Sequence, residues 1–459
     1  MIDLSRLTIS QAKEFLRQRC VSAKELVEMY FEEIKNRNNE LNAYLEVFKD
    51  AFEEAEKIDS RIKNGKELKF LEGIPFALKD NILIKGKRVS AGSKILDGYI
   101  ASYDAFATRK LKEAGAIFLG RTNMDEFAMG SSTENSAFGP VKNPFDLKRV
   151  AGGSSGGSAC AVAANMALAA LGSDTGGSIR QPSAFCGVVG LKPTYGSISR
   201  SGLIAMASSL DQIGPIAKTA EDAEMIFKAI KGKDPKDATG VDRPERPLKE
   251  KIIVGVVKEF SSGGEGIDER ILKQIESASR FLDSRNFEIK EVSLPSIAYS
   301  LACYYIIAPA EISANLARYD GVRYGKQRSG EFGFGKEAKR RIILGSYVLS
   351  AGYYDAYYGK ASKIRRLIKT DFEKVFNEVD ILMTPTAPGP AFKIGEKIEN
   401  PLAMYLSDLY TIPVNLAGLP AMSLPFGKID DLPVGVSLIA PWFGENLLFK
   451  MGKILENAG

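Results

Sequence analysis

The sequence predicts an α/β fold with a mixed β-sheet. Short apolar runs of strand length alternate along the chain with longer stretches of helical periodicity, and this alternation is typical of a sheet whose strands are joined through helices. The chain has 459 residues, of which 45% are apolar and 26% are charged. This length and composition fit a globular protein with one large domain or with two to three of average size.

The first 65 residues are expected to be helical. Thr8 and Gln11, and again Ser22 and Glu25, have the spacing of capping boxes, in which side chains and backbone amides bond reciprocally at the start of a helix. Apolar residues recur at helical spacing after the second box.

A buried strand is expected at residues 73–78, where an apolar run ends in Lys79, Asp80 and Asn81. Ligands bind at the carboxyl ends of strands in open α/β sheets, so this strand end is a candidate site. The later elements are expected in this order: helix 105–114, strand 116–120, helix 158–172, strand 252–257, helix 268–284, strand 287–293, helix 363–377, strand 380–384 and strand 434–439. A polar stretch at 232–250 is expected to be a surface connection.

The composition argues against a metal site, a disulfide framework and a membrane span. The chain has no histidine, and its four cysteines form no CxxC pair. We found no apolar run of about 18 residues and no apolar core of signal-peptide length at the start. We therefore expect no metal, no membrane and a cytoplasmic location. The net charge of +5 permits a partner that carries nucleic acid but does not indicate one.

Two glycine-serine clusters, at 152–158 and 174–182, are the most informative feature of the chain. A flexible loop is one interpretation, although apolar strands and a small-residue helix flank the clusters. A phosphate-binding loop is another, but neither GxxxxGK[ST] nor GxGxxG is present. The third is acyl transfer, in which a serine attacks a carbonyl carbon among backbone N–H groups.

A serine nucleophile needs a base, and without histidine a Ser-His-Asp triad is excluded. Lysine is the best remaining base, provided that burial lowers its pKa far enough to make it neutral. Lys79 follows five consecutive apolar residues and is the candidate. Taken alone, an exposed lysine at a strand end is the simpler interpretation.

Lys79 and the runs GGSSGGS and DTGGSIRQP together resemble the amidase signature family over nearly the whole chain. The resemblance implies a single large domain in which helices cover both faces of the sheet. It also implies a Lys-Ser-Ser triad, with Ser178 as nucleophile, Ser154 as the bridging serine after a cis peptide bond, and Lys79 as base.

The oxyanion donors implied by the same resemblance are the backbone amides of Thr175, Gly176 and Gly177, together with that of Ser178. Ser155 and Ser158 are then expected to be structural, as hydroxyls at the start of a helix.

Four further segments, at 122–131, 202–215, 350–358 and 404–420, resemble the A subunits of glutamyl-tRNA(Gln) or aspartyl-tRNA(Asn) amidotransferases. That resemblance implies a glutaminase without a cofactor of its own, which passes ammonia to the B subunit in a complex that also contains a C subunit. The same resemblance implies that the B subunit uses ATP and Mg²⁺ and that the misacylated tRNA is bound mainly through this subunit.

Glutamine as substrate calls for a cation at its α-carboxylate and an anion at its α-ammonium. By resemblance these are Arg341 and Asp408, with Ser131, Gly130 and Tyr304 as the pocket wall. The alternatives are a surface helix residue for Arg341, a helix N-cap for Asp408 and core packing for Tyr304.

The stretch 323–331 is shorter than in those subunits, so a helical excursion is expected to be missing there. Two other functions stay open. One is a free-standing hydrolase of another small amide, and the other is a nucleotide-binding or inactive scaffold protein.

Overall fold

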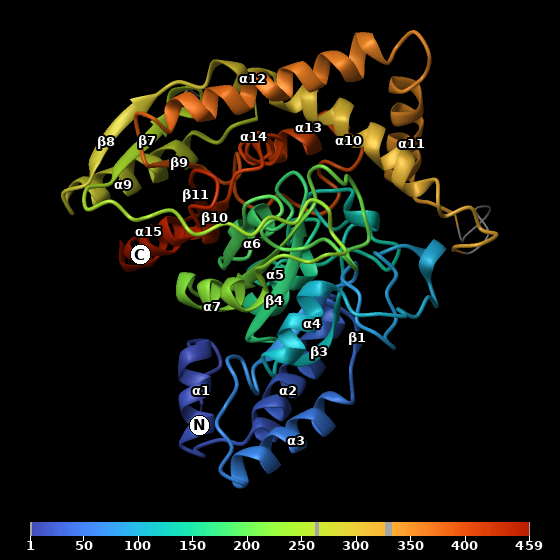
Figure 1. The fold of residues 1–459 in the computed structure, drawn as a ribbon, viewed down its shortest axis with the longest axis vertical. Coiled ribbons are helices and arrows are strands. Elements are labelled where there is room, and N and C mark those ends of the chain that lie inside the picture. Colours follow the sequence, from blue (N-terminus) through green and yellow to red (C-terminus); the bar gives the residue numbers. More distant parts are fainter. Residues whose placement is uncertain (1, 262–265, 326–332, 459) are drawn as a thin grey trace.

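The fold is built around one eleven-stranded sheet with the strand order β1-β3-β2-β4-β6-β5-β10-β11-β9-β7-β8 (Figure 1). The computed structural model describes residues 2–261, 266–325 and 333–458. The strands are β1 Tyr44–Val47, β2 Pro75–Lys79, β3 Ile117–Thr122, β4 Ala169–Asp174, β5 Val189–Lys192, β6 Gln212–Ala217, β7 Ile253–Val257, β8 Glu288–Val292, β9 Ile381–Pro385, β10 Ala421–Ile429 and β11 Leu432–Ile439.

The sheet is mixed, as the sequence predicts. Strand β2 runs parallel to both β3 and β4, and β7 runs parallel to β8 and β9. In the middle of the sheet, from β4 through β6, β5, β10 and β11 to β9, each strand is antiparallel to the next. Every residue of β2, β4, β6 and β11 is buried. Since neighbouring side chains of a strand point to opposite faces, both faces of the central sheet are covered.

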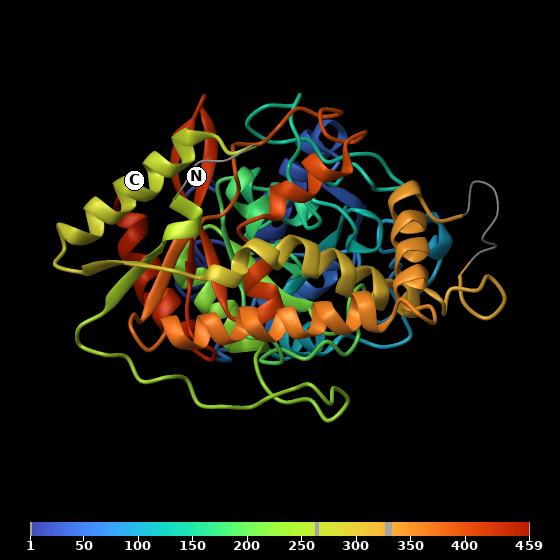
Figure 2. The ribbon, with the colours of Figure 1, turned by 90° about the horizontal axis from the view of Figure 1, so that it is seen from above.

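The helices lie around this sheet, with α10 and α12 side by side at one end and α11 against α10 (Figure 2). The helices are α1 Ile9–Arg17, α2 Ala23–Leu41, α3 Ala51–Lys63, α4 Phe106–Glu113, α5 Gly156–Ala163, α6 Arg180–Phe185, α7 Ala220–Ile230, α8 Lys258–Ser261, α9 Glu269–Asp283, α10 Ser300–Leu316, α11 Lys336–Val348, α12 Lys360–Val375, α13 Pro401–Tyr405, α14 Ile412–Ala417 and α15 Glu445–Leu455.

Most predicted elements are present, and both capping boxes form. Two expectations are wrong. The first 65 residues are not all helical, because β1 at Tyr44–Val47 pairs with β3. The helix expected at 158–172 ends at Ala163, and Ala169–Asp174 forms β4 between β2 and β6. Alanine favours helix, but burial between two strands decides the conformation of this segment.

Residues 232–250 contain no helix or strand and are mostly exposed. The expected missing excursion at 323–331 falls largely on residues outside the described ranges.

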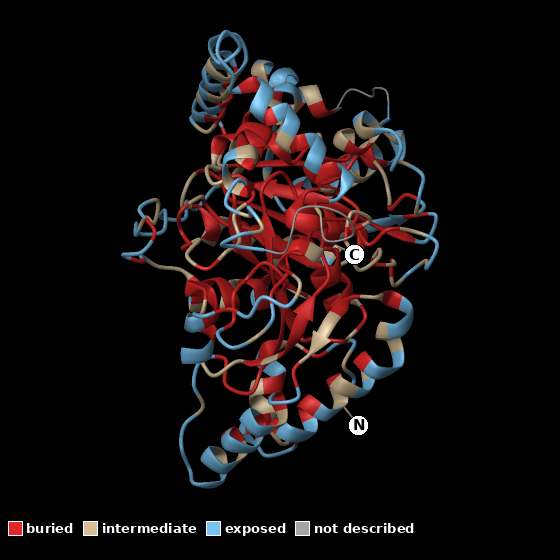
Figure 3. Cartoon of the chain, turned by 90° about the vertical axis from the view of Figure 1, so that its right-hand side faces the viewer, coloured by how far each residue is buried: buried red, intermediate tan, exposed pale blue. Residues whose placement is uncertain are grey.

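One described helical segment, Pro295–Leu316, has the length and hydropathy of a membrane span, and half of its most apolar window is buried. Its buried side chains pack with those of α11, α12 and α14. This is the packing of a core helix, and Figure 3 shows buried residues on the inner sides of the helices at that end.

Two large apolar clusters fill the interior and meet beside the glycine-serine clusters. One contains Leu78, Leu171 and Ile179 from the central sheet and its adjoining loop. The other contains Tyr304 and Ile412, from α10 and α14. The predicted site therefore lies where the central sheet meets the helical layer.

Candidate active site

Lys79 is the last residue of β2, and its ammonium group is completely buried among oxygens. Because β2 lies between β3 and β4, the Lys79 side chain reaches the first glycine-serine cluster and Ser173, the residue of β4 two places before the second turn begins at Thr175. Its Nζ lies 2.7 Å from Ser154 Oγ, 2.8 Å from Ser155 Oγ and 3.0 Å from Ser173 Oγ. The exposed-lysine interpretation is therefore wrong.

Burial lowers the pKa of Lys79 from 10.5 to about 7, although the more distant carboxylates of Asp125, Asp174 and Asp211 oppose the shift. Within the described residues Lys79 forms no ion pair. Hydroxyl groups stabilise an ammonium less than a carboxylate does, so desolvation decides the balance. A lysine with this pKa is substantially neutral near pH 7 and can accept a proton.

Ser155 does not cap α5, contrary to expectation. Its Oγ donates to the carbonyl oxygen of Ser173 at 3.1 Å, so the Ser155 hydroxyl proton is used in this hydrogen bond. Towards Lys79, Ser155 Oγ therefore acts as an acceptor and fixes one N–H of the amine. This orientation favours a Lys79 lone pair directed at Ser154. The sequence missed this role, although the residue adjoins Ser154.

Ser173 and Asn81 complete the surroundings of Lys79. Asn81 Nδ2 donates to Ser173 Oγ at 2.9 Å, and the Ser173 carbonyl oxygen lies 3.2 Å from Lys79 Nζ. Neither residue was predicted. Asn81 does stand in the polar run that ends the strand, and Ser173 lies at the carboxyl end of β4.

The peptide bond between Gly153 and Ser154 is cis, as the resemblance implies. A side chain at Gly153 would overlap Asp125 Oδ2 and the amide of Ser132. The Gly153 amide donates to Gln181 Oε1 at 3.0 Å. Gln181 also donates to the Ser131 carbonyl oxygen at 2.8 Å, so it joins the first cluster to the predicted pocket wall.

Ser178 lies in the second glycine-serine cluster, directly after Thr175–Gly177, and is 7% exposed, whereas Lys79 and Ser154 are fully buried. The backbone amide of Ser155 donates to the Ser178 carbonyl oxygen at 3.0 Å and holds the two clusters together. No hydrogen bond joins the hydroxyls of Ser154 and Ser178 in the described part of the chain. Catalytic contacts are often loose before substrate binds, and the proton relay stays a prediction.

Asp174 holds the turn before Ser178. Its carboxylate accepts the amides of Gly177 at 2.9 Å and Ile179 at 3.1 Å. Burial alone would raise its pKa, but the buried guanidinium of Arg180, 3.0 Å away, holds the pKa well below the usual range. Asn415 Nδ2 adds a bond of 2.8 Å from α14.

One of the predicted oxyanion donors, the backbone amide of Gly177, already has a partner. The amide of Gly177 is occupied by Asp174, whereas the amides of Thr175, Gly176 and Ser178 have no partner among the described hydrogen bonds. Gly177 has φ of +144°, and a side chain there would overlap Thr411 Oγ1. Gly177 therefore shapes the turn, and its neighbours supply the free donors.

Asp408 and Ser131 lie together, as a shared pocket requires. Their side chains are hydrogen-bonded, and burial raises the pKa of Asp408 to about 7. Asp408 Oδ1 would lie 3.2 Å from a Cβ atom placed on Gly177, so this carboxylate borders the nucleophile turn. Asp408 closes the short 3₁₀ turn Leu406–Asp408, so the N-cap alternative is wrong.

Tyr304 and Gly130 also border this region. The Tyr304 hydroxyl would lie 2.8 Å from a Cβ atom on Gly176, so its buried ring lies against the oxyanion turn as well as in the core. A Cβ on Gly130, next to Ser131, would overlap Asp125 Oδ1.

Arg341 is buried in α11, so the surface-residue alternative is wrong. Its Nε donates to Glu337 Oε1 at 2.7 Å, and its guanidinium lies 5.3 Å and 5.7 Å from the ring centres of Tyr305 and Tyr405. The two terminal nitrogens have no hydrogen-bond partner within the described ranges. They remain available for a carboxylate.

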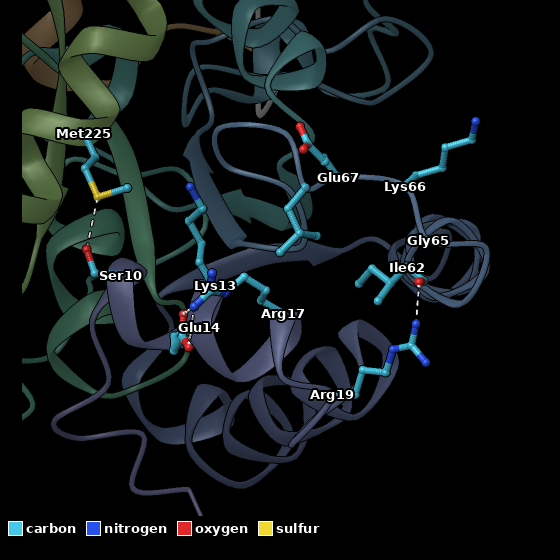
Figure 4. Close-up of a pocket in the computed structure, with 11 residues that line it drawn as sticks. Ser10, Lys13, Glu14, Arg17, Arg19, Ile62, Gly65, Lys66, Glu67 and Met225 are labelled. Atoms are coloured by element: carbon cyan, nitrogen blue, oxygen red, sulfur yellow. Dashed lines mark hydrogen bonds and ion pairs between the residues drawn. The ribbon is translucent and has the colours of Figure 1, made fainter.

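Figure 4 shows a separate hollow of about 720 Å³ on the N-terminal helices, which contains none of the predicted site residues. In this hollow Arg17 forms an ion pair with Glu14 at 2.8 Å, and Arg19 donates a hydrogen bond to the Ile62 carbonyl oxygen. In the described ranges, no group of three metal-ligating side chains could hold an ion.

The family profile described as "Amidase" matches residues 25–449. The chain belongs to the amidase family. It is 50% identical to the A subunit of the glutamyl-tRNA(Gln) amidotransferase of Clostridium botulinum strain Hall, over 477 aligned residues that cover 100% of this chain and 98% of that protein. The same-named protein of Carboxydothermus hydrogenoformans is 51% identical, covering 99% and 98%.

Solved structures share the fold. The crystal structure of the glutamyl-tRNA(Gln) amidotransferase A subunit from Thermotoga maritima matches with a TM-score of 0.84 and 44% identity, covering 100% of this chain and 96% of that one. A 6-aminohexanoate cyclic dimer hydrolase matches with a TM-score of 0.87 and 26% identity, covering 100% and 98%. The fold is therefore compatible with more than one amide.

We predict that the plot of kcat for amide hydrolysis against pH falls on the acidic side, and that the protonation of Lys79 determines this acidic limb. Protonation removes the base, so kcat should fall about tenfold per pH unit well below pH 7 and level off above it. The measurement is kcat at saturating amide across this range. A kcat that still rises steeply above pH 9 would contradict a lysine with a lowered pKa.

We predict that Ser155→Ala lowers kcat by about 10- to 100-fold and moves the midpoint of the acidic limb to lower pH, because the ammonium loses an acceptor. The matched control is Ser158→Ala, inside the helix α5 that begins directly after Ser155. Ser158 bonds Thr122 and the Leu171 carbonyl oxygen without touching Lys79. Equal effects of both substitutions on the pH profile would refute the positioning role.

Proposed function

We propose that this chain is the glutaminase subunit of a tRNA-dependent amidotransferase. The observation that carries the proposal is a buried Lys79 with a pKa near 7, in contact with the serines of a glycine-rich turn. The 50% identity to curated A subunits over the full length supports the same activity.

In this proposal, acylation begins when Ser178 Oγ attacks the side-chain carbonyl carbon of glutamine. The Ser178 proton passes to Ser154 Oγ, and the Ser154 proton passes to the neutral Nζ of Lys79. The free amides of Thr175, Gly176 and Ser178 are the donors that can stabilise the negative oxygen. The Lys79 proton then returns through Ser154 to the leaving nitrogen, the C–N bond breaks, and ammonia departs from a glutamyl ester of Ser178.

Deacylation uses water in the same way. Lys79 takes a proton from water through Ser154, and the water oxygen forms a bond to the ester carbonyl carbon. The proton then returns through Ser154 to Ser178 Oγ as the ester bond between the acyl carbon and Ser178 Oγ breaks, which releases glutamate. Protons and electrons balance without a metal or cofactor in this chain.

The charges around the pocket support glutamine as substrate. The terminal nitrogens of Arg341 suit the α-carboxylate. Burial raises the pKa of Asp408 to about 7, and an α-ammonium bound beside it would favour the ionised form, with the Ser131 hydroxyl orienting the carboxylate. A simple apolar amide would require neither charge. Both groups are buried, where a charge is costly unless it is fully paired. Arg341 bonds Glu337 through Nε and Asp408 accepts from Ser131, so a charged ligand would complete the pairing of both.

The proposal includes a protein partner. Ammonium is a poor nucleophile, so ammonia made near neutral pH needs a sheltered path to its acceptor. We infer that the B and C subunits receive it in the cytoplasm, and that ATP, Mg²⁺ and the misacylated tRNA are held mainly by the B subunit. The second candidate, a free-standing amide hydrolase, draws support from the shared fold of the cyclic dimer hydrolase.

We predict that Ser178→Ala lowers glutamine hydrolysis by at least about 1000-fold, because the cluster 174–182 contains no other serine and the bridging Ser154 is fully buried. Ammonia release is the measurement, with an unchanged melting curve as the control. Intact hydrolysis would show that the nucleophile is another residue.

We predict that Asp408→Asn raises KM for glutamine by about 10- to 100-fold, because a buried charged hydrogen bond to the α-ammonium is lost. The KM for an uncharged amide such as propionamide should change less than about threefold. If the KM values for glutamine and for propionamide rise by the same factor, Asp408 does not recognise the ammonium. The free-standing hydrolase then becomes the better proposal.

A further inference from the structure

The outer face of α11 and the turn that follows it form an exposed apolar surface. Six large side chains there are each 41% to 69% exposed, and we name them the tyrosine patch. Its members are Ile343, Leu344, Tyr347, Tyr353, Tyr354 and Tyr357. In Figures 1 and 3 this end of the chain lies away from the N-terminal helices, with exposed residues along its helices.

The tyrosine patch is already ordered. The ring of Tyr347 lies 4.4 Å from that of Tyr353 and 6.2 Å from that of Tyr357, centre to centre, and the latter two are 6.0 Å apart. Tyr357 lies in the π-helical turn Asp355–Gly359, and Tyr347 lies in α11. Rings fixed in advance lose little freedom on binding, and tyrosine is enriched in protein interfaces.

Folding does not account for this surface. The opposite face of α11 packs on α10, where a Cβ atom on Gly345 would overlap the Pro309 carbonyl oxygen. A helix with one buried face normally has charged residues on the other. Residues 342–359 contain a single charged side chain, Asp355. A charge-depleted, exposed apolar surface marks an interaction site.

The size of the tyrosine patch suits a protein partner. A fully exposed residue of this size has an accessible surface of about 200–250 Å². At their exposed fractions, the six residues together expose roughly 600–700 Å². A standard interface buries about 800 Å² per partner. A small ligand would not cover such a convex helix face.

The charges around the tyrosine patch select a different chain as the occupant. Lys336 and Lys339 precede it, and Lys360 and Lys363 follow it; all four are exposed, and none forms an ion pair within the described ranges. In a symmetric dimer, the same patch on two copies would bring these basic rims together. A partner with an apolar centre and an acidic rim avoids that repulsion.

We infer that the tyrosine patch docks the protein that accepts the ammonia. Naming this partner as the pair of B and C subunits rests on the proposed function. Helix α11 carries Arg341 on its inner face and the patch on its outer face, so a partner bound here lies one helix away from the glutamine carboxylate. Docking and substrate binding then share one rigid element.

The test uses the full chain and the purified B–C pair from the same source. The variant Ile343→Glu/Tyr347→Glu places two charges in the centre of the tyrosine patch. The matched control is Ile100→Glu, at a residue 57% exposed outside the patch. We expect the Kd for the B–C pair to rise at least 100-fold in the double variant and less than threefold in the control. Glutamine hydrolysis by the isolated chain should match wild type in both.

Each other outcome overturns the inference. Equal affinity of the wild type and the double variant would place the interface elsewhere and leave the proposed function standing. A wild-type chain that binds no B–C pair would remove the proposed function itself. A wild-type dimer that the double variant converts to monomer in sedimentation would identify a second copy as the occupant. Loss of salt-sensitive tRNA binding, with B–C binding intact, would identify RNA.

Discussion

The burial of one lysine at the end of a central strand is the constraint on which the site depends. Lys79 Nζ is surrounded by serine oxygens and a carbonyl rather than by a carboxylate. In water this amine would be protonated at pH 7, and desolvation makes the neutral form accessible. A carboxylate at the same distance would restore the ammonium and remove the base.

The glycine-serine clusters are shaped around that lysine. Close packing against Asp125 requires glycine at 153, and Gly177 allows a turn that Asp174 fixes through backbone amides. Buried ion pairing with Arg180 keeps the Asp174 carboxylate charged, and a charged acceptor makes stronger hydrogen bonds to those amides. The apolar clusters on either side provide the rigidity that such a preorganised turn needs.

The sequence predicted the mixed sheet, the strand before Lys79 and the glycine-serine turns, because local apolar runs and glycine spacing determine them. It could not predict contacts between distant segments. Ser173, Asn81 and Gln181 reach the site only through the pairing of β2 with β4 and the packing of α6. The error at 158–172 has the same origin, since alanine-rich sequence fits a helix until neighbouring strands bury it. Arg341 and Asp408 were predicted only through the resemblance to known subunits. The sequence itself gives no sign that these two side chains are buried.

The most direct test of the central claim is the titration of Lys79 itself. The enzyme would be prepared with ¹³Cε-labelled lysine, and Lys79→Met would identify the Lys79 resonance in two-dimensional NMR spectra recorded as a function of pH. We expect that resonance to titrate with a midpoint near pH 7, far below the other lysines that are exposed. A midpoint near 10.5 would mean that Lys79 is a permanent cation at neutral pH, and it would contradict a lysine base.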